Sequence, residues 1–310
     1  MGARRRHTRE FKREAVRWVR ERGVTMAQAA RDLDVKPRFG AERRCIMRIS
    51  EHCYPPGLSH QRHAHGETTC SIVLSGTLRE RVGTREQISR PFSMVLKPLD
   101  TEHADDFGPF GVRLLRITLS PETSRDALQW ARPLRCWRWT HSGPACRPFL
   151  QLARAMRGEV PSGELRSRYV ERLIWDTLAA LATADRSDVG RAPAKWLASA
   201  REALDDAVVP PRLSDLAALA GVHPVYLARQ FRRFYGCSTS GYLHRRRVQR
   251  AADLLGASQV PLARVSLEAG FTDQPHMCRI FRRETGLTPR QYQAIAGEVP
   301  SVQDAGKPIA

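Results

Sequence analysis

The sequence lacks the features that define several broad classes of protein. Its 7 cysteines are scattered and form no CxxC pair, which argues against a zinc finger or a disulfide framework and favours a reducing compartment. No apolar run is long enough to span a membrane, and no apolar segment follows the Arg-rich start. We therefore expect a cytoplasmic chain with no signal peptide and no membrane partner.

Acidic residues are also few compared with basic ones. There are 32 Asp and Glu against 51 Lys and Arg, which gives a formal net charge of +19. The excess gathers in two segments: residues 1–44 hold 14 basic against 6 acidic residues, and residues 212–297 hold 13 against 5. Such basic segments favour a polyanion such as DNA as the partner, and a solvated, Arg-rich surface is the alternative.

Residues 212–292 contain one short pattern twice, about fifty positions apart. Each copy has apolar residues at helical spacing, a break centred on a glycine (Gly221 and Gly270), and then an apolar stripe beside clustered arginines. A short helix, a tight turn and a basic helix make a helix-turn-helix. The second helix of that motif can lie in the major groove of DNA.

The second helix of each copy is predicted to be a recognition helix, over residues 224–234 and 274–283. In each, two apolar residues four positions apart are expected to face the core. They are Leu227 and Phe231 in the first copy and Met277 and Phe281 in the second. The residues on the other side of each helix are then free to meet a partner.

Residues 196–296 resemble the DNA-binding domain of the AraC/XylS family of bacterial transcription regulators. The motifs that carry the resemblance are LSDLAALAGVHPVYLARQFRRFYG, YLHRRRVQRAADLL and PLARVSLEAGFTDQPHMCRIFRRETGLTPRQY. The resemblance implies an all-α fold with two helix-turn-helix units bridged by one helix, here residues 239–256. At about 1.5 Å per residue this helix is roughly 25 Å long, which suits two recognition helices in successive major-groove segments.

The same resemblance implies which residues contact DNA. In the first unit it places contacts at Val225, Ala228 and Arg229; Tyr226 and Arg233 lie on the same side of the helix, away from the core. In the second unit it places contacts at Gln274, Pro275, Cys278 and Arg279, and Arg283 is either a phosphate contact or a solvated charge. Arginine can pair with guanine and glutamine with adenine, whereas proline and cysteine have little hydrogen-bonding capacity. The second unit is therefore expected to read partly by shape.

The middle of the chain is rich in strand-like sequence. Residues 41–120 contain apolar runs at 71–78 and 112–119, set off by Gly, Pro and Asp, which predict a small double-sheet barrel. Residues 121–195 are predicted to be a helical dimerisation or linker region. Its helices are expected at 121–132, 147–157 and 162–184, with an exposed linker at 185–195.

Histidines in this middle part form a second candidate site. His63, His65, Gly76 and His103 fall at the positions of the cupin metal motif, so this part resembles a cupin-like sensor barrel. Thr69 stands where the cupin motif has a glutamate. Three histidines without a carboxylate can still hold a divalent metal, but cupin-like sensor domains often keep these histidines without one. We therefore expect no cofactor and no metal, and treat the three histidines as an effector pocket, with a metal pocket as the alternative.

The N-terminus carries a third resemblance. The run RRRHTREFKREAVRWVRERGVTMAQAARDLDVKP resembles the start of insertion-sequence transposase helper proteins. Two helices of a helix-turn-helix are expected there, but no recognition helix follows Pro37. Residues 1–40 are therefore predicted to be a truncated remnant that adds only non-specific affinity, and residues 298–310 a disordered tail.

The predicted fold class is α+β and multidomain: a cupin-like β-barrel, a helical linker, and an all-α double helix-turn-helix domain over residues 196–297. The predicted function is an effector-responsive transcription regulator and not an enzyme. Its expected partners are double-stranded DNA, an unidentified small-molecule effector, a second copy in a homodimer, and RNA polymerase if it activates. The alternatives are a metal-dependent cupin enzyme, which the missing glutamate argues against, and a transposition accessory protein, which only residues 1–37 support.

Overall fold

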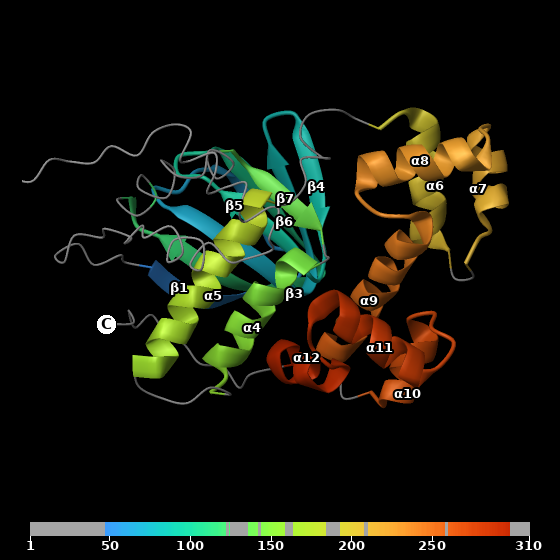
Figure 1. The fold of residues 1–310 in the computed structure, drawn as a ribbon. Coiled ribbons are helices and arrows are strands. Elements are labelled where there is room, and N and C mark those ends of the chain that lie inside the picture. Colours follow the sequence, from blue (N-terminus) through green and yellow to red (C-terminus); the bar gives the residue numbers. More distant parts are fainter. Residues whose placement is uncertain are drawn as a thin grey trace, which may run out of the picture.

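The computed structural model describes residues 47–121, 124, 136–141, 144–158, 164–183, 193–207, 210–257 and 260–297. A curled antiparallel sheet, two helices packed on one of its faces, and a group of C-terminal helices make up this part of the chain (Figure 1). The predicted remnant at 1–40 and tail at 298–310 lie outside the described residues. So do nearly all of the helix expected at 121–132 and most of the linker expected at 185–195.

Seven strands form a single sheet in the order β1-β6-β3-β5-β7, with β2 paired to β6 and β4 paired to β3. All of these pairings are antiparallel. The strands are β1 (Met47–Tyr54), β2 (Ser59–His63), β3 (Thr68–Val82), β4 (Arg85–Ser89), β5 (Ser93–Lys97), β6 (His103–Leu119) and β7 (Arg138–His141).

The helices follow the sheet. They are η2 (Pro144–Cys146), α4 (Arg147–Met156), α5 (Glu164–Thr183), α6 (Lys195–Asp206), α7 (Leu213–Ala220), α8 (Pro224–Tyr235), α9 (Thr239–Ala257), α10 (Leu262–Glu268), α11 (Gln274–Thr285) and α12 (Pro289–Ala296). Five of them, α4, α5, α8, α9 and α11, confirm helices predicted from the sequence, with ends within two residues. Among the described helices none has the length and apolarity that a membrane crossing requires.

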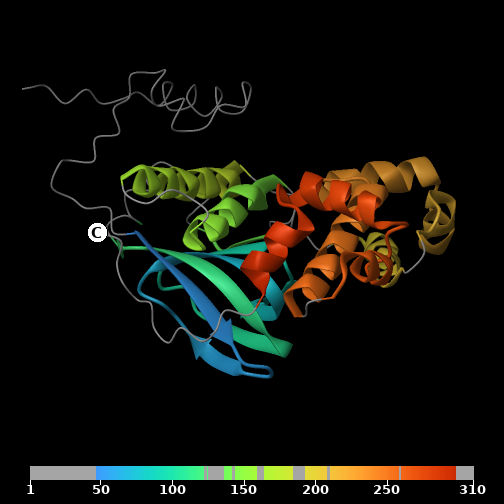
Figure 2. The same ribbon diagram turned by 90° about the horizontal axis from the view of Figure 1, so that it is seen from below.

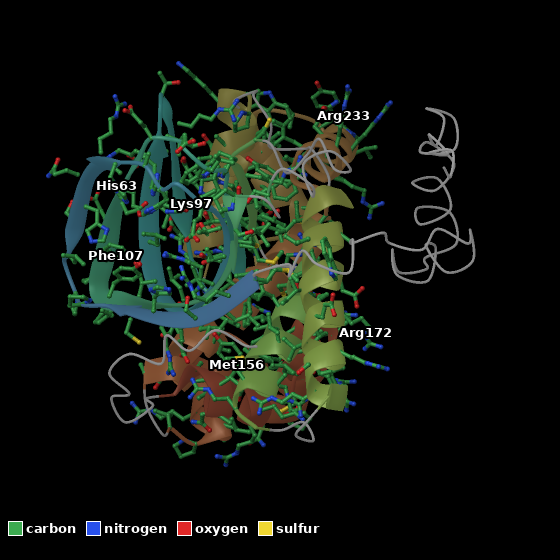
Figure 3. All side chains as sticks on the ribbon, turned by 90° about the vertical axis from the view of Figure 1, so that its left-hand side faces the viewer. His63, Lys97, Phe107, Met156, Arg172 and Arg233 are labelled. Atoms are coloured by element: carbon green, nitrogen blue, oxygen red, sulfur yellow. The ribbon has the colours of Figure 1, made fainter. Side chains whose placement is uncertain are left out.

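Strand alternation gives the sheet two different faces. Ile72 of β3 and Ile117 of β6 are fully buried in the core shared with the helices, so they point toward that side. Their chain neighbours Ser71 and Arg116 are hydrogen-bonded to each other on the opposite face. Figure 2 shows the helices on one side of the sheet, and Figure 3 shows the sheet curling round His63, Lys97 and Phe107 on the other.

Two glycines allow β3 and β6 to bend and cross closely. Gly76 has φ +79°, and a Cβ there would lie 2.0 Å from the carbonyl oxygen of Gly111. Gly111 has φ +71°, and its Cβ would lie 2.4 Å from the carbonyl oxygen of Tyr54. The pairing of β3 with β6 shifts register next to Gly76. Only glycine permits this approach and this conformation, so the curl of the sheet depends on both positions.

Two features differ from the sequence prediction. The described strands are hydrogen-bonded into one sheet rather than two, and a cupin barrel is not confirmed. Strand β7 lies inside the predicted helical region 121–195, between the helices expected at 121–132 and 147–157. Its four residues are too short a run to give a strand signal, and they form a strand because they pair with the edge of β5, from Ser93–His141 to Leu96–Arg138.

The two helix-turn-helix units have different cores. The first unit (α6, α7 and α8) packs on a core of its own: Leu197, Ala200, Leu204, Leu216, Ala217, Leu227 and Phe231. The second unit (α10, α11 and α12) shares one continuous core with the sheet, α4, α5 and the second half of α9. The sheet therefore packs directly against one reading unit, and α9 joins this unit to the other (Figure 1).

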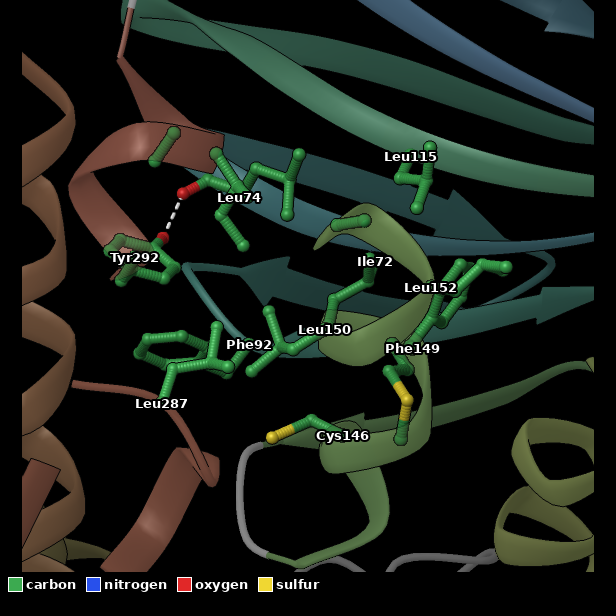
Figure 4. Packing of buried hydrophobic residues seen from close by; sticks show 14 of the residues in the cluster. Ile72, Leu74, Phe92, Leu115, Cys146, Phe149, Leu150, Leu152, Leu287 and Tyr292 are labelled. Carbon is green, nitrogen blue, oxygen red and sulfur yellow. Dashed lines mark hydrogen bonds between the residues drawn. The ribbon is translucent and has the colours of Figure 1, made fainter. Parts of the chain in front are cut away.

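Polar contacts hold helix α12 against the sheet. The Tyr292 hydroxyl donates to the carbonyl oxygen of Leu74 in β3, and the Tyr292 ring lies 5.0 Å from the Phe92 ring (Figure 4). At the C-terminal end of α12, Arg113 of β6 donates to the Ala296 carbonyl at 3.0 Å and Arg157 donates to the Ile295 carbonyl at 3.1 Å. Cationic side chains stabilise a helix C-terminus, so these arginines fix α12 on the sheet.

Candidate DNA interface and ligand pocket

The two recognition helices, α8 and α11, begin and end in the same way. Each starts after an extended residue whose side chain accepts a backbone N–H: His223 from Val225 at 3.3 Å, and Asp273 from His276 at 2.6 Å. Each ends at a glycine in the left-handed conformation. These are Gly236 (φ 68°) and Gly286 (φ 78°). Because these signals are local, both copies of the repeat present equivalent faces of a helix of the same length.

The structure places the core faces where the sequence predicted them. Leu227, Phe231, Met277 and Phe281 are all 0% exposed. Eight of the ten predicted contact residues are exposed, and Ala228 and Cys278 are half-buried. The exposed ones are Val225, Tyr226, Arg229, Arg233, Gln274, Pro275, Arg279 and Arg283.

The exposed arginines differ in how they are paired. Within the described part of the chain, Arg229, Arg233 and Arg279 have no carboxylate within ion-pair distance. Arg283 differs, because its Nη2 lies 3.1 Å from Glu284 Oε1 and 3.4 Å from His244 Nδ1. The first three guanidinium groups can therefore pair with a phosphate or a guanine edge without breaking an internal contact.

Pro275 and Cys278 have local roles on α11. Pro275 occupies the first turn of the helix, where a missing backbone N–H leaves no hydrogen bond unmade. Cys278 is half-buried and packs against the shared core. Gln274, Arg279 and Arg283 are thus the exposed residues of the predicted set in the second unit that can donate hydrogen bonds.

The arginines at the start of α9 connect helices within the protein. Arg246 Nε lies 2.6 Å from Asp205 Oδ1 of α6, and Arg245 Nε lies 3.8 Å from Glu284 Oε2 of α11. Arg247 is buried. These side chains therefore fix α9 between the two units rather than forming a solvated basic face.

A second candidate site is a pocket of about 500 Å³ in the concave face of the sheet. His63, at the end of β2, and His65, just after it, line this pocket, and both rings lie close to the buried ring of His103 at the start of β6. The His63 ring centroid lies 4.8 Å from that of His65 and 4.3 Å from that of His103. One ring nitrogen from each lies within 4.8 Å of the other two. The three predicted histidines thus converge, although His65 is not itself in a strand.

Backbone carbonyls orient two of these imidazoles. The Nδ1 atoms of His63 and His103 lie 2.7 Å and 2.9 Å from the carbonyl oxygens of Gln61 and Thr101. A carbonyl can only accept, so each Nδ1 carries the proton and each Nε2 presents a lone pair. Burial and then the charge of Lys97 lower the pKa of His103 to about 4, and burial lowers the pKa of His65. The rings of His103 and His65 are therefore neutral at pH 7.

Three buried charged residues beside the histidines were not predicted. Lys97 Nζ lies 2.8 Å from Glu80 Oε1 and 3.1 Å from Asp105 Oδ2. Burial raises the pKa of Glu80, which also accepts from Trp139 Nε1 at 2.8 Å. The alternation of side chains along a strand gave one signal: Glu80 stands two positions after the buried Leu78 and therefore points to the same face of β3. His60 was also missed, and it forms a second group with His63 and Asp105.

Comparison with known proteins identifies the C-terminal segment. Residues 216–295 match a family model described as a helix-turn-helix domain, and residues 1–39 match one described as a transposase. The regulatory protein PocR of Salmonella typhimurium is 28% identical over 87 residues, which cover 28% of this chain and 29% of PocR. The transcriptional activator RhaR of Salmonella arizonae is 33% identical over 72 residues, which cover 23% of this chain and 26% of RhaR.

The similarity to these relatives therefore spans less than a third of their length. Among solved structures, that of ToxT from Vibrio cholerae matches 81% of this chain and 98% of that one, at 10% identity and a TM-score of 0.35. The matched family model spans both α8 and α11 and the helix between them. Residues 216–295 of this chain are therefore an AraC-type helix-turn-helix domain.

Proposed function

We propose that this chain is an effector-responsive transcription regulator that reads two successive major-groove segments of DNA with α8 and α11. The observation that carries the proposal is the repeated recognition helix, with equivalent caps, the same buried stripe, and an unpaired arginine at the same place in each copy (Arg229 and Arg279). Helix α9 has 19 residues. At about 1.5 Å per residue it is roughly 28 Å long, close to one turn of the duplex.

The contacts we propose follow from the chemistry of each exposed side chain. Arg229 and Arg279 pair with guanine edges, and Gln274 pairs with adenine. Val225, Tyr226, Ala228, Pro275 and Cys278 make apolar or shape contacts, and Arg233 and Arg283 contact phosphates. The second unit then reads bases by hydrogen bonds from Gln274 and Arg279 and by shape at Pro275 and Cys278.

The effector site we propose is the concave pocket around His63, His65 and His103. Pockets of this size hold small molecules, and this one lies on the sheet that packs against the second reading unit. The remaining parts of the proposal are a cytoplasmic protein, a homodimer formed through the helical region after the sheet, and RNA polymerase as a partner if the protein activates transcription. Residues 1–40 would add only non-specific affinity.

The cupin resemblance implies a metal at the same histidines. Their donor set fits a divalent transition-metal ion, because His63 and His103 each present an Nε2 lone pair and His103 Nε2 has no hydrogen-bond partner among the described residues. Asp105, the carboxylate nearest His103, is engaged by Lys97 through both of its oxygens. We therefore propose that such an ion would be a regulatory ligand of the pocket, and metal analysis of the purified protein tests this.

Selection of DNA sites with the full-length protein, followed by footprinting, tests the proposed function. We expect two short protected blocks about 10 bp apart on one face of the duplex. Arg229→Ala should relax base preference in one block and Arg279→Ala in the other. Arg264→Ala is the matched control, since Arg264 is exposed on a scaffold helix and bonded to Glu268. Protection of a single block, or equal effects of all three variants, would contradict the proposal.

A further inference from the structure

One charged group in the concave pocket has no charged partner. Arg116 of β6 lines the pocket, and its Nε and Nη2 lie 3.3 Å from Ser71 Oγ and 3.2 Å from the Tyr54 hydroxyl. Both partners are neutral. Among the described residues no carboxylate lies within ion-pair distance of this half-buried guanidinium.

The other charges that line the pocket are already compensated. Arg62, at the mouth, lies 3.7 Å from Glu102, and Asp105 accepts from Lys97 at 3.1 and 3.2 Å. Of the Arg and Asp side chains that line the pocket, Arg116 is therefore the one with no oppositely charged partner among the described residues.

A neighbouring histidine lies in the field of this guanidinium. Burial and then the charge of Arg116 lower the pKa of His52 to about 4. A cation near an imidazole disfavours its protonation, so His52 does not add a positive charge beside Arg116 at pH 7.

We infer that the ligand of this pocket carries an anionic group, a carboxylate or a phosphate, that Arg116 binds; the inference rests on the proposed role of the pocket as the effector site. A guanidinium presents five N–H donors in a fork that matches both groups, and only two of its nitrogens are engaged here. A half-buried, unpaired charge is costly, and an anionic ligand removes that cost.

The walls of the pocket indicate what the rest of the ligand is like. Tyr54 and His60 line the pocket with their rings edge-on and the centroids 5.8 Å apart, and the buried Phe107 stacks on Tyr54 at 4.1 Å. Flat rings of this kind pack well against a planar or apolar body. The ligand class is therefore a small acid with an aromatic or apolar body.

Titration calorimetry of the full-length protein tests this inference with matched probes. The probes are benzoate, phenyl phosphate and benzamide, the last having the ring of benzoate without its charge. The titrations are done at one fixed ionic strength with a chelator present. We expect benzoate or phenyl phosphate to bind at least tenfold more tightly than benzamide, and the better of the two acids identifies a carboxylate or a phosphate ligand.

Two variants then locate the binding group. Arg116→Gln keeps a hydrogen-bond donor for Ser71 and Tyr54 and removes the charge, so acid binding should fall at least tenfold. Arg62→Gln is the control, because Arg62 also lines the pocket but is exposed and paired with Glu102. The affinity of the Arg62→Gln protein for the acids should change less than twofold. If Arg116→Gln does not fold, the comparison of benzoate with benzamide on the unaltered protein still decides whether the pocket requires an anionic group.

Several results would overturn the inference. These are equal binding of benzoate and benzamide, no binding of any probe at millimolar concentration, an equal loss in both variants, or acid binding that appears only when Zn²⁺ replaces the chelator and does not depend on Arg116. Footprinting without any probe tests DNA reading separately. A protein that protects DNA and binds neither acid would overturn this inference and leave the proposed DNA-binding function standing.

Discussion

Replacing Phe92 should weaken the contact between the sheet and the second reading unit. Phe92 lies just before β5 and is 1% exposed. Its ring lies 5.9 Å from that of Phe281 on α11 and 5.0 Å from that of Tyr292 on α12. Removing the ring therefore removes a contact with both helices at once and leaves a cavity between them and the sheet.

The size of the effect follows from burial and backbone conformation. Phe92→Ala deletes a fully buried ring, which typically costs about 3–5 kcal/mol of unfolding free energy. Phe92 has φ 69°, a left-handed conformation that alanine does not relieve and glycine does. Phe92→Gly should therefore be less destabilising than Phe92→Ala by about 1 kcal/mol, although it removes one more carbon.

Urea unfolding and hydrogen exchange read out these two expectations. In Phe92→Ala, amides of α11 and α12 should lose protection, whereas α7 and α8 should keep theirs because the first unit has a separate core. Leu216→Ala, in that separate core, is the matched control and should give the opposite pattern. The reasoning is refuted if Phe92→Ala and Leu216→Ala loosen the same helices, or if Phe92→Gly is the less stable of the two Phe92 variants.

Three further predictions follow from other parts of the chain. Arg229→Ala should weaken binding to a selected DNA site by about 1–3 kcal/mol, measured against Arg264→Ala, and an unchanged affinity would contradict its place at the interface. Deleting residues 1–40 should flatten the salt dependence of DNA affinity and leave the selected sequence unchanged, so an altered consensus would show that this segment reads bases. Burial raises the pKa of Asp253 to about 7, so the stability that its protonated form contributes is present below about pH 4 and is lost as the pH rises through 7. Asp253→Asn should therefore raise the melting temperature at pH 8, because it removes a cost of up to about 4 kcal/mol in unfolding free energy, and should leave the melting temperature unchanged at pH 4. A variant that is no more stable than the unaltered protein at pH 8 would mean that Arg90 and Arg246 stabilise the carboxylate.

The sequence predicted the reading helices well because their signals are local. The stripe of Leu227 and Phe231, the N-terminal prolines and the terminal glycines all lie within one helix and its turns, and they appear twice. The helix predicted at 162–184 likewise formed α5, and its apolar residues Leu173, Ile174, Leu178 and Leu181, which recur at helical spacing, lie in the core. In each of these elements local propensity and tertiary packing agree.

The sheet was predicted less well because its geometry depends on distant partners. Whether strands form one sheet or two is decided by pairings such as that of β3 with β6, which join residues 23 to 51 positions apart. The role of Lys97 depends on Glu80 and Asp105, which come from different strands. Nothing in the sequence around Arg116 shows that it lacks a carboxylate partner. Such properties arise only when the fold brings separate segments together.

The pocket and the core that holds the second reading unit lie on opposite faces of the same strands. Ser71 and Arg116 face the pocket, and their neighbours Ile72 and Ile117 lie in the core that also holds Phe281 and Tyr292. Side chains on a strand alternate strictly, and packed cores repack in steps rather than deforming smoothly. A ligand that shifts β3 or β6 from the concave face must therefore also shift the surface on which α12 rests. Because Tyr292 and Arg113 fix α12 to those two strands, and α9 separates the first unit from them, such a shift would change the position of α11 relative to α8. In that arrangement the ligand would act on the distance between the two reading helices, not on the side chains that read the bases.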